Sequence, residues 1–379
     1  MSEQSSRHYD IVVIGAGMAG ASVAYELAAD YRVAVLEMEG HPGYHTTGRS
    51  AAVFSETYGP APIRALTSQS RAFYENPPEI FGREPLLSPR GALFIARKDQ
   101  GESLDELSEN LSGQPGVRPV GSDEIQRLSP LLHPGYAERG LLEEDARDID
   151  VNALHQGYLR GFKKRDGDVV VNAEVMSLVQ DGGQWKFSSR SGEFSAPVMI
   201  NAAGAWADEI AMKAGVNTVG LVPKRRTAMI VRAPDGENPD AWPVTVDVDE
   251  QFYMKPDAGR LLISPADETP SAPCDAQPEE MDIAICIDRI QQAFALDVRR
   301  VENSWAGLRS FVEDHAPVCG FDPQADGFFW LAGQGGYGIQ SAPGLSQLAA
   351  RLVAGKPMPD GLEARGFKLS DVSPDRFRR

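Results

Sequence analysis

The sequence has little that would support a disulfide framework, a metal centre or a membrane span. Its three cysteines, Cys274, Cys286 and Cys319, are odd in number and widely spaced, which favours a reducing cytoplasm and excludes a CxxC redox or zinc pattern. The six histidines show no metal-ligand spacing, so no metal is expected. No apolar run approaches the roughly 20 residues that a helix needs to cross a bilayer.

Basic residues are also scarce. The 379 residues include 37 Lys and Arg against 54 Asp and Glu, a net charge of −17. Nucleic acids and anionic membranes attract clustered basic side chains, so neither is expected as a partner. The negative charge fits a monomer. Residues 1–6 have neither the basic nor the apolar region of a secretory signal, which again favours the cytoplasm.

The clearest positive feature is a glycine-rich turn between an apolar run, 11–14, and a helix-like stretch, 21–29. Gly15 permits a tight turn, Gly17 lets the backbone approach a pyrophosphate, and Gly20 lets helix and strand pack closely. The N-terminus of such a helix also offers N–H groups to phosphates. The turn therefore predicts a phosphate-binding site.

An acidic residue follows at the spacing that a dinucleotide needs. Glu37 ends the next apolar run, 33–36, where its carboxylate is placed to accept hydrogen bonds from a ribose. Together with the turn, Glu37 predicts a dinucleotide site. Because NAD and FAD share the same ADP half, these residues alone do not separate the two cofactors.

The order of strand, glycine turn and helix recurs twice along the chain. Short apolar runs of this kind are typical of strands buried on both faces of a parallel sheet. The second occurrence comprises a helix over 151–164 with Asp150 as its N-cap, strands at 168–171 and 173–175, and the run 198–204, and the third comprises 327–333 and a helix over 342–353.

Two intervening segments have a different pattern. Alternation of period two, as in 227–231, indicates a more antiparallel sheet. We therefore expect an α/β fold with a Rossmann-like dinucleotide domain and an inserted mixed-sheet α+β substrate domain, whose interface holds the active site. The predicted dinucleotide domain is discontinuous and covers 1–84, 146–222 and 316–379, and the substrate domain covers 85–145 and 223–315.

Three further motifs resemble the FAD-dependent amine oxidoreductases of the D-amino-acid oxidase superfamily. They are Gly43-Tyr44-His45-Thr46-Thr47-Gly48-Arg49-Ser50-Ala51-Ala52, Asn201-Ala202-Ala203-Gly204-Ala205-Trp206 and Gln334-Gly335-Gly336-Tyr337-Gly338-Ile339-Gln340. The likeness spans nearly the whole chain. Within the superfamily the chain is most similar to bacterial D-arginine dehydrogenases, through the segments 42–45, 85–90, 223–226 and 305–311.

The resemblance implies FAD as the cofactor. Some sarcosine oxidases attach the flavin to a cysteine near the segment that corresponds to 309–311, where this chain has none, so the FAD is expected to be non-covalent and Cys319 to be a buried packing residue. The residues implied are Gly15, Gly17, Ala19, Gly20, Glu37 and Met38 at the ADP moiety, Thr46, Thr47, Gly48, Arg49, Ser50, Ala51, Ala52 and Val53 from the pyrophosphate to the flavin edge, Val175 at the adenine, Gly204, and Gly335, Gly336, Tyr337, Gly338, Ile339 and Gln340 at the pyrimidine side of the flavin.

The reaction implied is oxidative deamination of a D-amino acid. A hydride passes from Cα to flavin N5, and the imine hydrolyses to a 2-oxo acid and ammonia, with a quinone or O2 as the final electron acceptor. A guanidinium is the best single group for holding the substrate carboxylate, and Arg309 and Arg226 are the candidates. Neighbours on a strand face opposite sides, so only one of Arg225 and Arg226 enters the pocket, and the family match selects Arg226.

Two tyrosines and a glycine complete the implied catalytic set. Tyr253 matches a carboxylate-contacting hydroxyl, with Phe252 facing away, and Tyr58 matches a lid or pocket-wall residue. The backbone carbonyl of Gly336 is expected to accept a hydrogen bond from the substrate amine. No general base stands out, so activity is expected to rise with pH as the amine loses its proton.

The sequence departs from the D-arginine dehydrogenases at two pocket positions. Ala92 stands where they carry a glutamate that pairs with the substrate guanidinium, and Val53 stands where they carry a histidine. A cationic side chain buried without a partner is costly, so a neutral or apolar substrate is predicted. Glu56 is the one nearby acid, and we expect it to face solvent.

Two alternatives stay open. One is an oxidase or demethylase of N-methyl or secondary-amine amino acids, as in sarcosine oxidases. Those enzymes carry a lysine in the strand after the tyrosine that matches Tyr253, whereas 260–264 has none, which favours a dehydrogenase. The other is a flavin-binding partner without turnover, against which the convergence of Arg226, Tyr253 and Arg309 argues.

Overall fold

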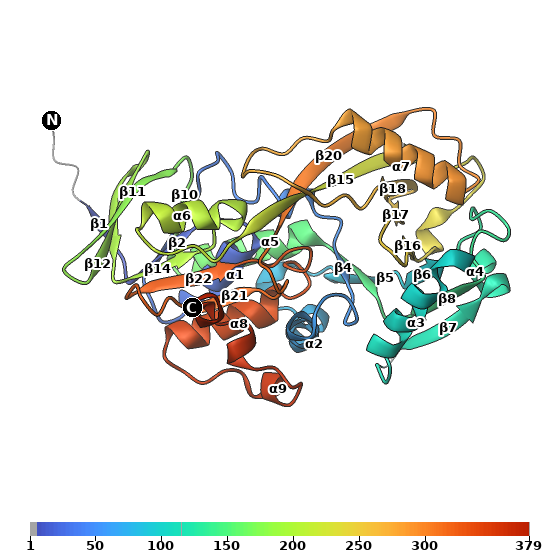
Figure 1. The fold of residues 1–379 in the computed structure, drawn as a ribbon. Coiled ribbons are helices and arrows are strands. Elements are labelled where there is room, and N and C mark those ends of the chain that lie inside the picture. The colour runs from blue at the N-terminus through green and yellow to red at the C-terminus, as the bar shows by residue number, and fades with distance from the viewer. Residues whose placement is uncertain (1–5, 115, 379) are drawn as a thin grey trace.

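A six-stranded sheet organises one half of the molecule (Figure 1). The computed structural model describes residues 6–114 and 116–378; residues 1–5, on which the prediction about a signal peptide depends, lie outside this range. Five strands are parallel and β21, at one edge, is antiparallel. The strand order is β10 (Asp168–Val170), β3 (Val33–Leu36), β2 (Ile11–Ile14), β14 (Val198–Asn201), β22 (Phe328–Ala332) and β21 (Val318–Phe321).

Helices cover one face of this sheet. The apolar sides of α1 (Met18–Leu27), α5 (Val151–Lys164) and α8 (Ala342–Val353) share one core with β2 and β22, and α2 (Ala61–Glu75) packs on α8. The prediction for α5 is confirmed, and the Asp150 side chain caps it by accepting a hydrogen bond from the Ala153 N–H at 2.7 Å. The first helix begins at Met18 rather than 21, because the glycine turn itself enters the helix.

A small sheet covers the opposite face and was not predicted. Its order is β1 (Arg7–His8), β13 (Gly192–Ala196), β12 (Gln184–Ser189) and β11 (Val175–Asp181), with α6 (Ala207–Lys213) beside it. The strand predicted at 173–175 therefore starts only at its last residue and continues into this sheet. The small sheet packs on the six-stranded sheet through three buried aromatic side chains of β12 and β13, which are Trp185, Phe187 and Phe194.

A nine-stranded sheet organises the other half of the molecule. All its pairings are antiparallel except that of β16 with β6. Figure 1 shows the two long strands, β15 and β20, running side by side from the centre of the molecule into this half. The order is β19 (Thr269–Pro270), β15 (Val222–Arg232), β18 (Arg260–Ser264), β17 (Tyr253–Asp257), β16 (Val244–Asp247), β6 (Ala92–Ala96), β8 (Arg139–Glu143) and β7 (Val117–Gly121), with β20 (Val301–Phe311) paired to β15.

Three more helices belong to this half, and a short sheet connects the halves. The helices are α3 (Gly101–Asn110), α4 (Ser122–Leu128) and α7 (Glu280–Ala293); the remaining α9 (Asp360–Glu363) lies near α2. The short sheet has the order β4 (Val53–Phe54), β9 (Arg147–Ile149), β5 (Leu87–Pro89). Because β5 pairs with β9 across the predicted boundary at 145, the division into two domains is kept as a proposal.

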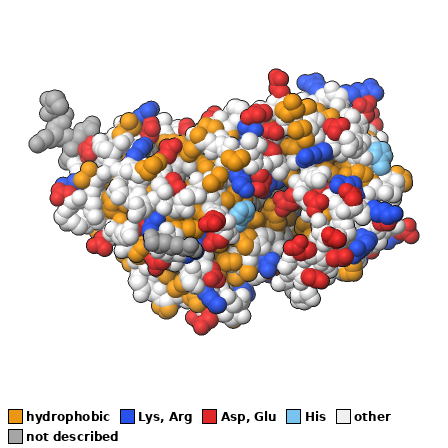
Figure 2. Space-filling view, viewed as in Figure 1, with side chains coloured by type: hydrophobic (Ala, Val, Ile, Leu, Met, Phe, Trp, Pro, Cys, Tyr) orange, Lys and Arg blue, Asp and Glu red, His pale blue; other side chains and the backbone are white. Residues whose placement is uncertain are grey.

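Cys286 and Cys319 are buried and Cys274 is exposed, all three with free thiols. Across the residues that the structure describes, no helix combines the length and apolar character that membrane crossing requires. Acidic side chains are scattered over both halves of the face shown in Figure 2, with Lys and Arg side chains among them.

Candidate active site

A cavity of about 400 Å³ lies where the two large sheets meet. One end is formed by the carboxyl ends of β2 and β3, with Gly15 and Glu37, and the other by side chains on one face of β6, β15, β16 and β17. Ligands of open parallel sheets bind at the carboxyl ends of the strands, so the first end has the position expected of a nucleotide site.

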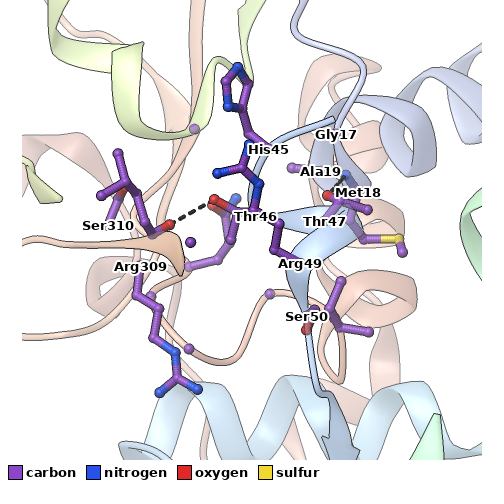
Figure 3. Close-up of a pocket in the computed structure, with 18 of the residues that line it drawn as sticks. Gly17, Met18, Ala19, His45, Thr46, Thr47, Arg49, Ser50, Arg309 and Ser310 are labelled. Atoms are coloured by element: carbon purple, nitrogen blue, oxygen red, sulfur yellow. Dashed lines mark hydrogen bonds between the residues drawn. The ribbon is translucent and has the colours of Figure 1, made fainter. Parts of the chain in front are cut away.

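The glycine turn closes the first end of the cavity. Gly17 is the N-cap of α1 and has no side chain to occupy the space in front of the helix. The Met18 N–H donates to Thr47 Oγ1 at 2.9 Å (Figure 3). Glu37 accepts from the Ala16 N–H at 2.7 Å. Gly20 does not line the cavity: a Cβ there would lie 1.8 Å from the Gly15 oxygen, so its task is close packing of the helix on the turn.

The segment after β3 forms a bridge across the middle of the cavity. Thr46 Oγ1 donates to the Leu308 carbonyl at 2.8 Å, and Arg49 Nη1 donates to the Ala306 carbonyl at 2.9 Å. Figure 3 shows Thr46, Thr47, Arg49 and Ser50 between Gly17 on one side and Arg309 on the other. These bonds fix the nucleotide-binding end relative to β20, which carries Arg309.

Most of the predicted cofactor residues line this one cavity. Those that do are Gly15, Gly17, Ala19, Glu37, Met38, Thr46, Thr47, Arg49, Ser50, Ala51, Ala52, Val53, Val175, Gly204, Gly335, Gly336, Gly338, Ile339 and Gln340. Gly20, Gly48 and Tyr337 do not. The Gly48 N–H donates to the Gly43 carbonyl, and the Tyr337 ring packs on Tyr58 with its centroid 4.9 Å away.

The wall of the cavity fits a flavin nucleotide. Ser310 Oγ and Gln334 Nε2 line it, are buried, and have no hydrogen-bond partner within the described part of the chain. Buried polar atoms left unpaired are costly, so both call for polar atoms of a ligand. Gly336 adds a close approach, because a Cβ there would lie 2.8 Å from Arg309 Nη1. The sequence motifs around Gly336 gave no signal for Ser310.

Arg309 faces the cavity and has no acidic partner among the described residues. Its Nη1 lies 3.4 Å from Tyr58 Oη, and in 6–114 and 116–378 no carboxylate lies within ion-pairing distance of it. Burial acts to lower the pKa of Arg309, but the neighbouring Tyr58, Tyr253 and Glu250 outweigh it, and the pKa is raised. A half-buried, permanently charged guanidinium of this kind suits a carboxylate ligand.

The paired arginines on β15 face opposite sides, as alternation predicts. Arg226 lines the cavity, whereas Arg225 pairs with Asp282 of α7 at 2.9 Å. Arg226 was predicted to hold the substrate carboxylate; part of its charge is already matched, because its Nη2 lies 2.9 Å from Glu268 and 3.8 Å from Glu250. Both acids follow Arg226 by more than twenty residues, and the sequence gave no sign of the pairing.

β17 contributes two polar side chains to the cavity wall. Tyr253 lines the cavity and Phe252 lies in the core behind it, as predicted. Lys255, two residues after Tyr253, also lines the cavity and was missed. Alternation of period two from Tyr253 would have found it. No lysine of β18 is among the described residues that line the cavity, so the preference for a dehydrogenase stays a prediction.

The positions that depart from the D-arginine dehydrogenases also lie in the wall. Ala92 and Val53 both line the cavity. Glu143, paired with Ala92 across the sheet, is not in the wall: it is buried and accepts hydrogen bonds from Ser55 Oγ at 2.6 Å and Thr57 Oγ1 at 2.7 Å, and burial raises its pKa. Glu56 pairs with Arg71 and stays outside the cavity wall, although it is half-buried rather than fully exposed.

A buried histidine supports the glycine turn from behind. His155 on α5 is 4% exposed, its Nε2 donates to the Ala16 carbonyl at 2.9 Å, and Gly43 packs on its ring. Burial lowers the pKa of His155 from its ordinary value of 6.5. Below that value the unfolded chain binds a proton that the folded chain excludes, so this contribution to stability is lost as the pH falls from 6.5 towards the lowered folded-state pKa.

We predict that His155→Gln, which keeps a donor for the Ala16 carbonyl, has a smaller loss of melting temperature between about pH 7.5 and pH 5.5 than the unmodified protein. The difference is expected to be on the order of 1 °C. Thermal unfolding of both proteins at the two pH values measures it. Identical losses would show that His155 does not titrate in this window.

Comparison with known proteins gives the family. The family model described as FAD dependent oxidoreductase (DAO) matches residues 10–352. A glycine oxidase of Bacillus licheniformis is 24% identical over 370 residues, covering 93% of this chain and 95% of the relative, and the beta subunit of a sarcosine oxidase of Rhodobacter capsulatus is 28% identical over 193 residues, covering 48% and 46%. The crystal structure of a glycine oxidase from Geobacillus kaustophilus superposes with a TM-score of 0.83 at 23% identity, covering 97% of this chain and 98% of that chain.

The family model spans most of the chain, and the fold is that of the solved relative. Both results confirm the predicted fold class and FAD as the cofactor. The predicted closer likeness to D-arginine dehydrogenases is not supported, because these relatives are glycine and sarcosine oxidases. The chain belongs to the DAO family of FAD-dependent oxidoreductases.

Proposed function

We propose that this chain oxidises the carbon–nitrogen bond of an α-amino acid, with Arg309 binding the substrate carboxylate. The observation that supports this most is the placement of Arg309, a cation without an acidic partner among the described residues, in the wall of the cofactor cavity beside Tyr58 and Tyr253. A bidentate guanidinium–carboxylate pair with a tyrosine hydroxyl beside it would fix the orientation of the Cα–H bond, and that positioning is the main task of the protein in this chemistry.

The remaining roles follow from the same arrangement. Bound FAD supplies the acceptor for the hydride that leaves Cα, and the resulting imine reacts with water to give a 2-oxo acid and ammonia. Tyr253 donates to the substrate carboxylate, and the Gly336 carbonyl accepts from the amine. Tyr58 holds Arg309 in place, and burial raises the pKa of Tyr58, which keeps its hydroxyl a donor. Arg226, paired with Glu268, contributes charge to the wall rather than a free guanidinium.

We further propose a D-amino acid without positive charge on its side chain as the substrate. Ala92 and Val53 offer small apolar surfaces where a cationic side chain would need a carboxylate, and neither Glu56 nor Glu143 lines the cavity. From these residues a neutral or apolar side chain is favoured. D-arginine is then a poor substrate despite the sequence resemblance to D-arginine dehydrogenases.

An amino acid with an N-methyl or other secondary amine is the second candidate. Two of the relatives are named glycine oxidase and sarcosine oxidase subunit beta, which favours this alternative about as well as the first. We keep as proposals a non-covalent FAD, a cytoplasmic monomer, and either O2 or a quinone as acceptor.

The experiment that tests the function is anaerobic reduction of the bound flavin, followed by the loss of its visible absorbance in a stopped-flow instrument. The panel holds the D- and L-enantiomers of Ala, Met, Leu, Pro, Asp, Glu and Arg together with glycine and sarcosine. Fast reduction by D-enantiomers other than D-Arg supports the first candidate, and reduction only by secondary amines supports the second. If no member reduces the flavin, the proposed function is wrong.

A further inference from the structure

The side chain of Lys255 forms part of the cavity wall. Its strand, β17, is separated from β20, the strand of Arg309, by β15 and β18. Lys255 lies on β17, and its side chain is 9% exposed. Its Nζ donates to Asp148 Oδ1 at 2.7 Å. Because burial of an ammonium group costs several kcal/mol unless its charge is matched, the charges around Lys255 decide what this part of the wall can bind.

The charge of Lys255 is only partly matched. Asp148 on β9 is shared with Arg90, whose guanidinium lies 2.7 Å from Asp148 Oδ2 and also donates to the Asp240 and Trp242 carbonyls. Within the described residues, no second carboxylate lies within ion-pairing distance of Lys255 or Arg90. Two cations therefore share one anion, and the group carries a formal charge of +1 next to the cavity.

The position of Lys255 relative to the proposed carboxylate site is set by the strand. Tyr253 and Lys255 are two residues apart on one face of β17, so their Cα atoms are separated by about 6.6 Å. A chain of four carbon–carbon bonds spans about 5 Å. A substrate whose first carboxylate meets Arg309 and Tyr253 is therefore long enough for a second carboxylate to reach Lys255.

The surrounding wall leaves space for such a side chain. Val244 and Val246 on the neighbouring strand β16 line the cavity beside Lys255, as do Ala92 and Val53. These side chains are short and apolar, so they offer no hydrogen bond to compete with Lys255 for a polar group. Among the described residues that line the cavity, Lys255 is the charged side chain of β17; Glu250, just before this strand, also lines the cavity and lies 3.8 Å from Arg226.

We infer that the side-chain end of the cavity binds a second carboxylate through Lys255, so that the preferred substrates are dicarboxylic amino acids. The inference rests on the proposed function and changes it at one point: the favoured substrate side chain carries negative charge instead of being neutral or apolar. The second carboxylate balances the +1 charge shared by Lys255, Asp148 and Arg90, while an amide of the same shape does not.

The test uses ligands that cannot react. Glutarate and its monoamide, glutaramate, have the same length, lack an amine and differ in one charge. Their dissociation constants for the FAD-loaded enzyme are measured by perturbation of the flavin absorption spectrum. We expect glutarate to bind at least about tenfold more tightly than glutaramate, the order expected for one charge-assisted hydrogen bond in a buried site.

Three variants assign the difference to Lys255. Lys255→Met is expected to abolish the preference for glutarate, and Lys255→Arg to retain it. Lys186→Met removes an exposed lysine that pairs with Asp181 in the small sheet, and it should leave both constants unchanged.

The outcomes separate the two proposals. Equal binding of the two ligands by the unmodified enzyme, which needs no variant to fold, overturns the inference, and so does a preference that survives in Lys255→Met. A preference for glutarate in an enzyme whose flavin no amino acid reduces would support the carboxylate site and contradict the proposed function. Reduction by neutral amino acids without any preference for glutarate would do the reverse.

Discussion

Replacing Arg309 with methionine is expected to weaken substrate binding by about two to three orders of magnitude while FAD stays bound. The loss of one partner of a buried charge pair costs about 2–5 kcal/mol, and each 1.4 kcal/mol is tenfold in affinity. The hydrogen bonds that hold the glycine turn and Glu37 in place do not involve Arg309, so the protein should retain its FAD. The dissociation constant comes from the substrate dependence of flavin reduction, and the FAD content from the absorbance of the purified protein.

Two further variants serve as controls. Arg309→Lys keeps the charge but loses the two-point contact, and it should bind more weakly than the unmodified enzyme and more tightly than Arg309→Met. Arg225→Met removes a buried arginine on the opposite face of β15, where it pairs with Asp282, and should leave the substrate constant within about twofold. If Arg309→Met loses its FAD while substrate affinity hardly changes, Arg309 is a structural residue.

Adding one methyl group at Gly20 is expected to prevent folding of the cofactor half, whereas the same change at Gly17 leaves a folded protein with weak FAD binding. A Cβ at Gly20 would lie 1.8 Å from the Gly15 carbonyl oxygen, which is backbone and cannot move aside. We expect a destabilisation of about 3 kcal/mol or more. At Gly17 the Cβ would meet only Thr47 Oγ1, at 3.3 Å, and would extend into the space in front of α1.

The two glycine variants are compared by circular dichroism, thermal unfolding and titration with FAD. Gly17→Ala should keep the spectrum of the unmodified protein and lose about tenfold or more in FAD affinity, because its methyl group obstructs approach of the pyrophosphate to the backbone. Gly20→Ala should yield little soluble protein. A Gly20→Ala protein that folds and binds FAD normally would contradict the packing role, and normal affinity in Gly17→Ala would place the phosphates elsewhere.

The features that the sequence predicted correctly are those fixed by neighbours along the chain. Three such features depend on residues at most a few positions apart: the turn between β2 and α1, the cap that Asp150 provides for α5, and the opposite strand faces taken by Arg225 and Arg226. Backbone geometry, capping and side-chain alternation decide such features locally. The cofactor motif belongs to the same class, because its glycines act on the backbone in which they stand.

What surrounds the substrate end of the cavity was decided by the tertiary structure alone. Lys255 and Asp148 are 107 residues apart, and Arg226 and Glu268 are 42 residues apart. The first pair depends on how β9 of the short sheet lies against β17, and the second on the pairing of β15 with β19, which Glu268 precedes. Burial makes these pairings matter, because a charged group removed from water is destabilised unless an opposite charge lies beside it. The sequence by itself therefore determined a dinucleotide site, and the fold determined which charges face the substrate.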